Sequence, residues 1–230
     1  MITEKNEHNA ERKKKYIQIA SRILEQEGPE GINIRRIAKE AGCTSAVLYK
    51  HFENLDHLLV MASVKFLEPY ISDFIAISKR NDITSVQKDL LLWKKFIMEA
   101  FSNRTYYLQM FYGSNREILE DCLYEYYSLF PDEEKGFDGF GASIIFSSNL
   151  LDREFIRLRR AAHEKLITIE NARLLTRLAV AVFDGMFLKS DEYTESKGGY
   201  ILEAEECYRL IWELFNRFVE PGTDLNIDGL

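Results

Sequence analysis

A short stretch around residue 48 brings together side chains suited to contact with nucleic acid. Tyr49, Lys50 and His51 carry hydrogen-bond donors on side chains long enough to reach phosphate oxygens. The residues at 45–47 are small, so a backbone that carries them can approach the edges of bases. Donors for phosphates beside small residues for base edges suit sequence-specific DNA binding, provided that one rigid element presents both.

The remaining reactive side chains do not form a pattern that predicts catalysis or a metal centre. The four histidines show no metal-ligand spacing with cysteines or carboxylates. The three cysteines are odd in number and never form a C-x-x-C pair, which argues against a zinc site and a disulfide framework. Glycines at 136–141 follow a G-x-x-G-x-G order, but a nucleotide-binding loop would need a strand before it. We therefore expect no metal, no cofactor and no enzymatic activity.

Helical periodicity places the DNA-contacting stretch in a helix-turn-helix. A first helix is predicted at 11–27, where a Gly-Pro pair ends it. Asn33 suits the N-cap of a second helix, and Gly42 suits the residue after its end, where φ is often positive. A third, short helix is predicted at 45–52, and a fourth from 54 to about 79.

The third helix has one apolar face and one free face. Small residues at 38, 41 and 42 let the second and third helices cross closely. Leu48 and Phe52 share a face and can anchor the third helix to its neighbours. The outer face then stays available for a major groove.

This stretch resembles the DNA-binding head of TetR-family repressors. The family pattern I-x-x-I-A-x-x-A-G-x-[ST]-x-[GA]-x-L-Y-x-[HY]-F matches residues 34–52, within a motif at about 33–52 and a similarity over roughly 10–70. The resemblance implies that Arg35, Thr44 and Tyr49 contact phosphates, that residues 45–47 face bases, and that His51 lies at the border between the two. With Lys50 added, the predicted DNA-binding set is Arg35, Thr44, Ser45, Ala46, Val47, Tyr49, Lys50 and His51.

Two positions depart from the family pattern. Val47 stands where the family often has Thr, so it could contact a thymine methyl group instead of donating a hydrogen bond. Leu55 stands where the family usually has a Lys that holds a phosphate. We therefore expect fewer phosphate contacts, with the backbone at the start of the fourth helix compensating.

Beyond residue 54 nearly every segment also repeats with the helical period, and none alternates as a strand does. Helices are predicted at about 84–101, 105–111, 116–130, 143–166, 169–189 and 200–219. The predicted fold is all-α, with a helix-turn-helix domain at 1–54. A larger helical domain at 55–230 is expected to bind an effector and to dimerise, as the family resemblance also implies.

The last two predicted helices are apolar over wide faces, more than the core of one chain is expected to cover. This pattern, together with the resemblance, predicts a homodimer. The predicted interface residues are Leu175, Leu178, Val182, Gly185, Tyr208, Ile211, Trp212 and Phe215.

An aromatic-rich segment either lines an effector pocket or only fills the core. Its candidate ligand-binding residues are Trp93, Phe96, Tyr106, Tyr107, Met110 and Phe111. Four arginines at 153, 157, 159 and 160 are likewise open to two interpretations, a solvated helix face or an anion site.

Charge is distributed unevenly along the chain. The formal net charge is -7, yet residues 1–52 carry ten basic and seven acidic side chains, against 20 and 30 in the rest. A basic head on an acidic body fits a protein that meets phosphate at one end. The charged N-terminus lacks the apolar core of a signal peptide, and no apolar run reaches the ~20 residues of a membrane span. We expect a cytoplasmic protein with no membrane partner.

Together these features predict a DNA-binding transcriptional regulator. The main hypothesis is a repressor that a small-molecule effector releases from a pseudo-palindromic operator. One alternative keeps the DNA-binding architecture without small-molecule control, as an architectural or protein-regulated factor. A helical enzyme is the other alternative, and it would need a catalytic cleft that the sequence does not indicate.

Overall fold

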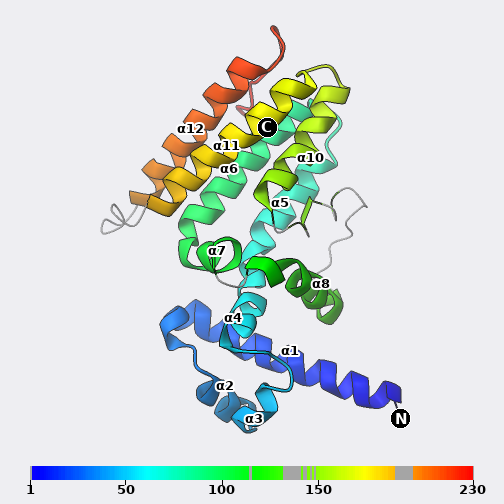
Figure 1. Ribbon diagram of the computed structural model, residues 1–230, viewed down its shortest axis with the longest axis vertical. Helices are drawn as coiled ribbons and strands as arrows, with labels where there is room; N and C mark the ends of the chain where they lie inside the picture. Colours follow the sequence, from blue (N-terminus) through cyan, green and yellow to red (C-terminus); the bar gives the residue numbers. More distant parts are fainter. Residues whose placement is uncertain are drawn as a thin grey trace. The chain divides into compact units, whose positions relative to one another are not determined.

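A computed structural model describes residues 2–113, 116–131, 149–189 and 199–229, together with Gly141, Ile144, Ile145 and Ser147. Within these residues every regular element is a helix, which confirms the all-α prediction (Figure 1). The chain forms two compact units. Unit 1 comprises Met1–Glu68 and Thr105–Gly136, and unit 2 comprises Pro69–Arg104 and Phe137–Leu230.

Unit 1 contains the helix-turn-helix. Its helices are α1 (Ile2–Glu27), α2 (Ile34–Ala41), α3 (Ser45–Leu48), α4 (Leu55–Ser63), α7 (Arg104–Phe111) and α8 (Leu119–Leu129). Short 3-10 segments lie between them: η1 (Pro29–Gly31), η2 (Val64–Leu67) and η3 (Arg116–Ile118). The apolar face of α1 is buried, because Ile17, Ala20, Ile23 and Leu24 are each at most 1% exposed.

Both ends of α2 lie where the sequence predicts them. The Asn33 side chain accepts a hydrogen bond from the backbone N–H of Arg36 at 2.8 Å. Gly42 has a φ of 74°, in the left-handed region that favours glycine. The backbone N–H of Cys43 donates to the carbonyl of Ala38 at 2.9 Å, which closes the helix end as in a Schellman motif.

The third helix is shorter than the predicted 45–52. It ends at Leu48, and the chain continues in a tighter turn. In this turn the backbone N–H of His51 donates to the carbonyl of Leu48 at 2.8 Å, three residues back rather than four.

The prediction of one helix from 54 to about 79 is wrong. α4 ends at Ser63, η2 follows, and α5 spans Glu68–Ser78. Pro69 explains the break, because its ring has no N–H and clashes with the turn that an uninterrupted helix would place before it. In the first turn of α5 the missing N–H costs nothing. The boundary between the two compact units falls at this same proline.

The α7 and α8 segments belong to unit 1 although they are distant in sequence from the helix-turn-helix. The Tyr106 hydroxyl donates to the carbonyl of Leu24 in α1 at 2.7 Å. The Tyr106 ring stacks on Phe66, with 3.7 Å between ring centroids. This compact unit is therefore larger than residues 1–54, and a functional boundary near residue 54 remains a prediction.

Unit 2 is a helical bundle. Its helices are α5, α6 (Ser85–Ser102), α10 (Leu150–His163), α11 (Ile169–Lys189) and α12 (Gly199–Phe218). Phe183 of α11 lies in the core, with its ring centroid 5.2 Å from that of Phe96 and 5.9 Å from that of Trp93. The predicted connection at 136–141 and the start of the predicted helix at 143–166 lie largely outside the described residues. Among the helices that are described, none is long and apolar enough to cross a membrane.

The left-handed backbone at Gly42 generates a stability prediction. Gly42→Ala should lower the free energy of unfolding by about 1–2 kcal/mol, because a Cβ is unfavourable at that φ. Gly42→Asn is the matched control and should lose less, since Asn tolerates the left-handed region better. Urea denaturation measures both variants. A Gly42→Ala variant as stable as the wild type would contradict the role of this turn.

Candidate nucleic-acid interface

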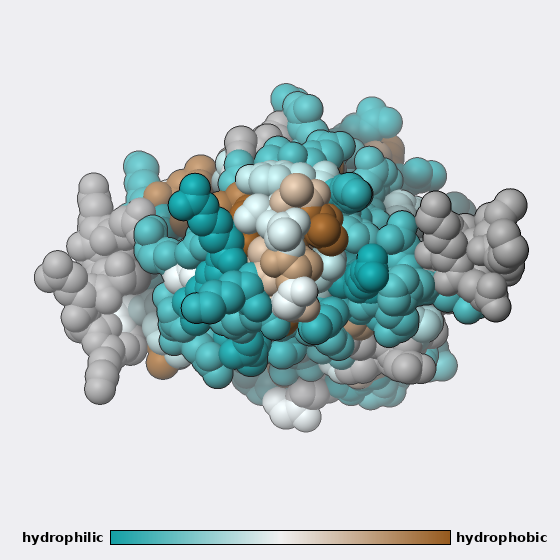
Figure 2. Space-filling model, turned by 90° about the horizontal axis from the view of Figure 1, so that it is seen from below, coloured by the Kyte–Doolittle hydropathy of each residue, from teal (hydrophilic) through white to brown (hydrophobic). Residues whose placement is uncertain are grey.

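The outer face of α3 and of the turn after it is open to solvent. Tyr49 is 55% exposed, and Thr44, Ala46 and Lys50 are also exposed. Ser45, Val47 and His51 are half-buried. Thr44 caps the start of α3 without using its side chain for a cap hydrogen bond. Seen from the end of unit 1 where α2 and α3 lie, the surface is hydrophilic around a small apolar patch (Figure 2).

The inner face of this segment is held by two buried side chains. Leu48 is 0% and Phe52 1% exposed. The ammonium group of Lys13 in α1 lies 4.9 Å from the centroid of the Phe52 ring, a cation–π contact. Lys13 also donates to Glu125 of α8 at 2.6 Å. These contacts fix the orientation of the segment without using its outer side chains.

The two adjacent arginines of α2 have different environments. Arg36 donates to Glu27 of α1 at 2.6 Å and to the carbonyl of Gly31 at 3.2 Å. It also pairs with Glu40 one turn along α2 at 3.3 Å. Arg35 points to solvent instead. The predicted phosphate contact is thus the exposed arginine, while its neighbour fastens α2 to α1.

A lysine of α1 caps the end of α2. Lys15 Nζ donates to the carbonyl of Ala41 at 3.0 Å. A cation at a helix C-terminus also interacts favourably with the helix dipole. Sequence reasoning missed the structural roles of Lys13, Lys15 and Arg36. Only the i,i+4 spacing of Arg36 and Glu40 could have indicated one of them.

Two histidines pack among the side chains that hold α3 in place. The His51 ring meets Tyr16 edge-on at 5.3 Å, and the His57 ring meets Phe52 edge-on at 5.7 Å, both between centroids. Burial lowers the pKa of both histidines, and the positive charge of Lys13 lowers each further. Both shifts favour the neutral form of the rings, in which His51 can still donate one hydrogen bond.

The predicted ligand-binding residues are divided between the two compact units. Trp93 and Phe96 are buried in unit 2, where they pack with Phe183. The remaining four belong to unit 1: Tyr106, Tyr107, Met110 and Phe111. All but Tyr106 are at most 5% exposed. The two sets therefore belong to different compact units, and their role in binding a ligand stays a prediction.

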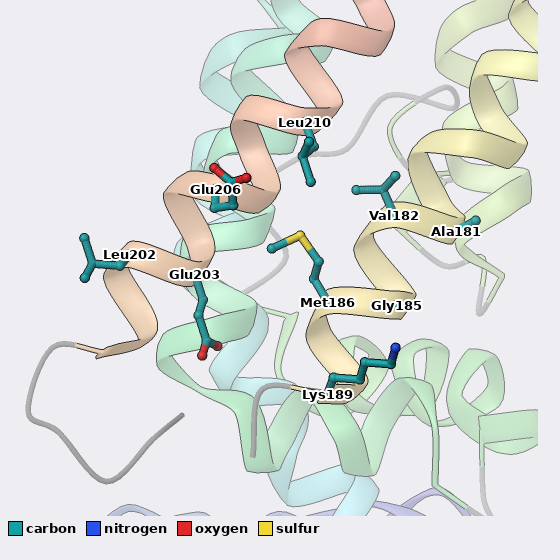
Figure 3. Close-up of a pocket in the computed structure, with 9 residues that line it drawn as sticks. All are labelled: Ala181, Val182, Gly185, Met186, Lys189, Leu202, Glu203, Glu206 and Leu210. Carbon is teal, nitrogen blue, oxygen red and sulfur yellow. The ribbon is translucent and has the colours of Figure 1, made fainter. Parts of the chain in front are cut away.

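An apolar groove of about 590 Å³ lies between α11 and α12 (Figure 3). Val182, Gly185 and Met186 of α11 line one side, and Leu202 and Leu210 of α12 line the other. In Figure 3 the Met186 side chain projects from α11 toward α12. Three carboxyl or ammonium side chains complete the lining: Lys189, Glu203 and Glu206.

The predicted dimer residues differ in their position relative to this groove and in their burial. Val182 and Gly185 line it, whereas Leu178, Tyr208 and Trp212 are half-buried on the same two helices. Leu175, Ile211 and Phe215 are each 0% exposed. These three pack within unit 2 and cannot face a second copy, because the opposite side of each helix carries the exposed residues.

Comparisons with known proteins bear on both units. A family model described as "Bacterial regulatory proteins, tetR family" matches residues 17–61, from the middle of α1 into α4. A curated HTH-type transcriptional regulator of Staphylococcus aureus strain MRSA252 is 26% identical over 150 residues, which cover 60% of this chain and 77% of that protein. One from the bovine strain RF122/ET3-1 is 27% identical over 148 residues, with the same coverage.

Solved structures share the fold over most of the chain. A TetR transcription regulator from Haloarcula marismortui superposes with a TM-score of 0.54 at 16% identity, covering 91% of this chain and 99% of that one. A protein of unknown function from Rhodococcus sp. RHA1 has a TM-score of 0.57 at 14% identity, covering 91% and 96%. At these identities the comparisons show only that the fold is shared, including that of unit 2. They do not identify a ligand.

The two neutral histidines predict a pH dependence of stability. The unfolded chain binds protons on histidine below about pH 6.5, whereas the folded chain resists them until a lower pH. Stability should therefore be full above about pH 6.5 and fall as the pH drops from there toward 5. Urea denaturation at pH 7.5 and 5.5 measures the loss. His57→Gln should reduce it, and His163→Gln, which replaces an exposed histidine of unit 2, should not. An equal loss in both variants would contradict the assignment.

Proposed function

The chain belongs to the TetR family of bacterial transcription regulators, and on that premise we propose that it binds double-stranded DNA as a homodimer. In this proposal α3 enters the major groove, residues 45–47 face bases, and Arg35, Thr44 and Tyr49 contact phosphates. Lys50 adds one more phosphate contact beside the groove. DNA binding would place the protein in the cytoplasm, where a bacterial operator lies.

One observation carries this proposal. The segment from Thr44 to Lys50 is attached to the protein through Leu48 and then Phe52, and it leaves its donors exposed. A helix that only filled a core would bury its bulky side chains, yet Tyr49 is more than half exposed. Contacts with bases and phosphates require a rigidly held element whose hydrogen-bonding groups are exposed.

The DNA proposal predicts distinct effects for phosphate and base contacts. Lys50→Ala should weaken binding to all sequences alike and reduce the salt slope of the affinity by about 1, since one phosphate contact is lost. Val47→Ala should instead change which base is preferred, at about 1–3 kcal/mol per base pair. Fluorescence anisotropy with an operator selected from random DNA, at several salt concentrations, measures both.

The control for this experiment is Arg159→Ala, which removes an exposed arginine of unit 2. It should leave the affinity and the salt slope unchanged. If Lys50→Ala and Arg159→Ala had equal effects, α3 would not be the DNA-binding element.

The groove between α11 and α12 supports the homodimer. Contiguous apolar surface that is exposed to water often serves as an interaction site. A second copy would bring the same groove and build a four-helix interface around a two-fold axis. Lys189 on one side of the groove and Glu203 and Glu206 on the other supply opposite charges for such a contact.

Gly185 offers a test of the homodimer. A Cβ at this position would meet no atom within 4 Å in the single chain, so Gly185→Glu should leave the fold of unit 2 intact. In the proposed interface it would bury a charge, and the protein should be monomeric at micromolar concentration. Ala76→Glu adds the same charge at an exposed position of α5 and should remain dimeric. Light scattering that finds Gly185→Glu dimeric would contradict the interface.

We also propose that a small molecule regulates the binding of DNA. A repressor is released when its effector prefers the state that does not bind DNA, a coupling typically worth about 1–3 kcal/mol. Operator DNA must then weaken effector binding by the same factor. The Staphylococcus aureus relatives and the Haloarcula marismortui protein are described as transcription regulators. The alternative is a protein-regulated factor of the same architecture, which a thermal-shift screen without any small-molecule response would favour.

A further inference from the structure

A small cavity in unit 2 lies among α5, α6 and α10. Its volume of about 30 Å³ leaves room for roughly two water-sized groups. Two apolar side chains form part of its wall, and the polar lining consists of Ser78, Ser85, Lys88, Asp89, Arg157 and Arg160. Three of these six residues are cations, and one is an anion.

Two of the lining residues are buried donors. Lys88 is 9% exposed, and its ammonium group donates to the carbonyl of Ser78 at 3.1 Å. Among the described residues, no carboxylate forms an ion pair with it. Ser85, one turn before Lys88 on α6, is 8% exposed, and its buried hydroxyl has no hydrogen-bond partner in the protein. Glu164 and Asp82 act on the ammonium group only from beyond ion-pair distance. A buried ammonium group without a direct ion pair and a buried hydroxyl without a partner are both costly, and a bound anion would relieve both.

Charged groups of α10 lie around Lys88 and Ser85. Arg157 binds Oδ1 of Asp89 and, on its other side, the carboxylate of Glu154. The second oxygen of Asp89, Oδ2, is buried and unpartnered. It belongs to the one acidic side chain of the wall, whose other oxygen forms the ion pair with Arg157. Arg160 pairs with Glu164 at 3.4 Å, and its side chain is 50% exposed, so the cavity reaches the surface there.

The protein itself places a carboxylate at this corner. Oε2 of Glu164 accepts a hydrogen bond from the backbone N–H of Ser85 at 3.3 Å. Ser85 is the first residue of α6, a helix of 18 residues whose free N–H groups favour negative charge. The same corner therefore already stabilises one carboxylate, immediately beside the cavity.

We propose that this cavity binds the carboxylate of an acidic small molecule, with Lys88 and Ser85 as its direct contacts. The two oxygens of a carboxylate match the space for two water-sized groups. The rest of the molecule leaves the cavity past Arg160. The inference rests on the proposed effector control, because it gives the effector its chemical class.

Acetate tests the site, with acetamide as the uncharged probe of the same shape. Both are titrated against the full chain at constant ionic strength, and the rise of the unfolding temperature gives an apparent affinity. Acetate should stabilise the wild type more than acetamide does. Lys88→Met keeps the length of the side chain and should weaken acetate binding about tenfold or more, because a charge-assisted hydrogen bond is lost. Ser85→Ala should weaken it less.

Lys79→Met is the matched control, since Lys79 is an exposed lysine near the end of α5. It should respond to acetate as the wild type does. An advantage of acetate over acetamide that survives Lys88→Met, or no advantage in the wild type, overturns the site. Operator affinity measured on the same samples separates the two proposals. DNA binding without an acetate response refutes only the carboxylate site, and an acetate response without DNA binding refutes the regulator.

Discussion

The proposed binding of DNA depends on the packing of one buried side chain, Phe52, which holds α3 in place. α3 has four residues, too few for a helix to be stable alone, so tertiary contacts must hold it. Phe52 supplies them from just beyond the helix, with the ammonium of Lys13 over its ring and His57 against its edge. Because the anchor lies on the inner face, the donors on the outer face keep their freedom to meet DNA.

α1 is the common platform for these contacts. From one helix, Lys15 caps α2, Glu27 holds Arg36, and Lys13 reaches both Phe52 and Glu125 of α8. Exposed ion pairs contribute little each, whereas several that share one helix fix its orientation. The basic residues of this head are therefore divided between two tasks. Arg35 and Lys50 remain exposed, as the proposed phosphate contacts require, whereas Lys13, Lys15 and Arg36 hold the helices together.

Local features of the fold could be predicted from the sequence, because they depend on neighbouring residues. Asn33 and Gly42 mark the two ends of α2 through a side chain and through the backbone, and each does so in the structure. Pro69 also indicates a helix break from the sequence alone. The prediction of one uninterrupted helix from 54 to about 79 did not take it into account. The helix-turn-helix motif was recognisable since its small and apolar residues recur in a fixed register.

Long-range packing could not be predicted in the same way. Lys13 and Glu125 are 112 residues apart, and their spacing carries no signal. The aromatic residues from Trp93 to Phe111 are close in sequence, yet the chain passes from unit 2 to unit 1 between them. In α11 and α12, apolar side chains lie both in the core and along the groove. Periodicity alone therefore could not assign Leu175 to the core and Val182 to the groove.

Hydroxyl-radical footprinting on a selected operator tests the central claim most directly. Two copies of α3 in successive major grooves must sit about 34–36 Å apart, one turn of the double helix. The account predicts two protected patches of equal strength, related by two-fold symmetry and separated by about 10 base pairs on one face of the DNA. A single patch, or protection that does not depend on sequence, would contradict it.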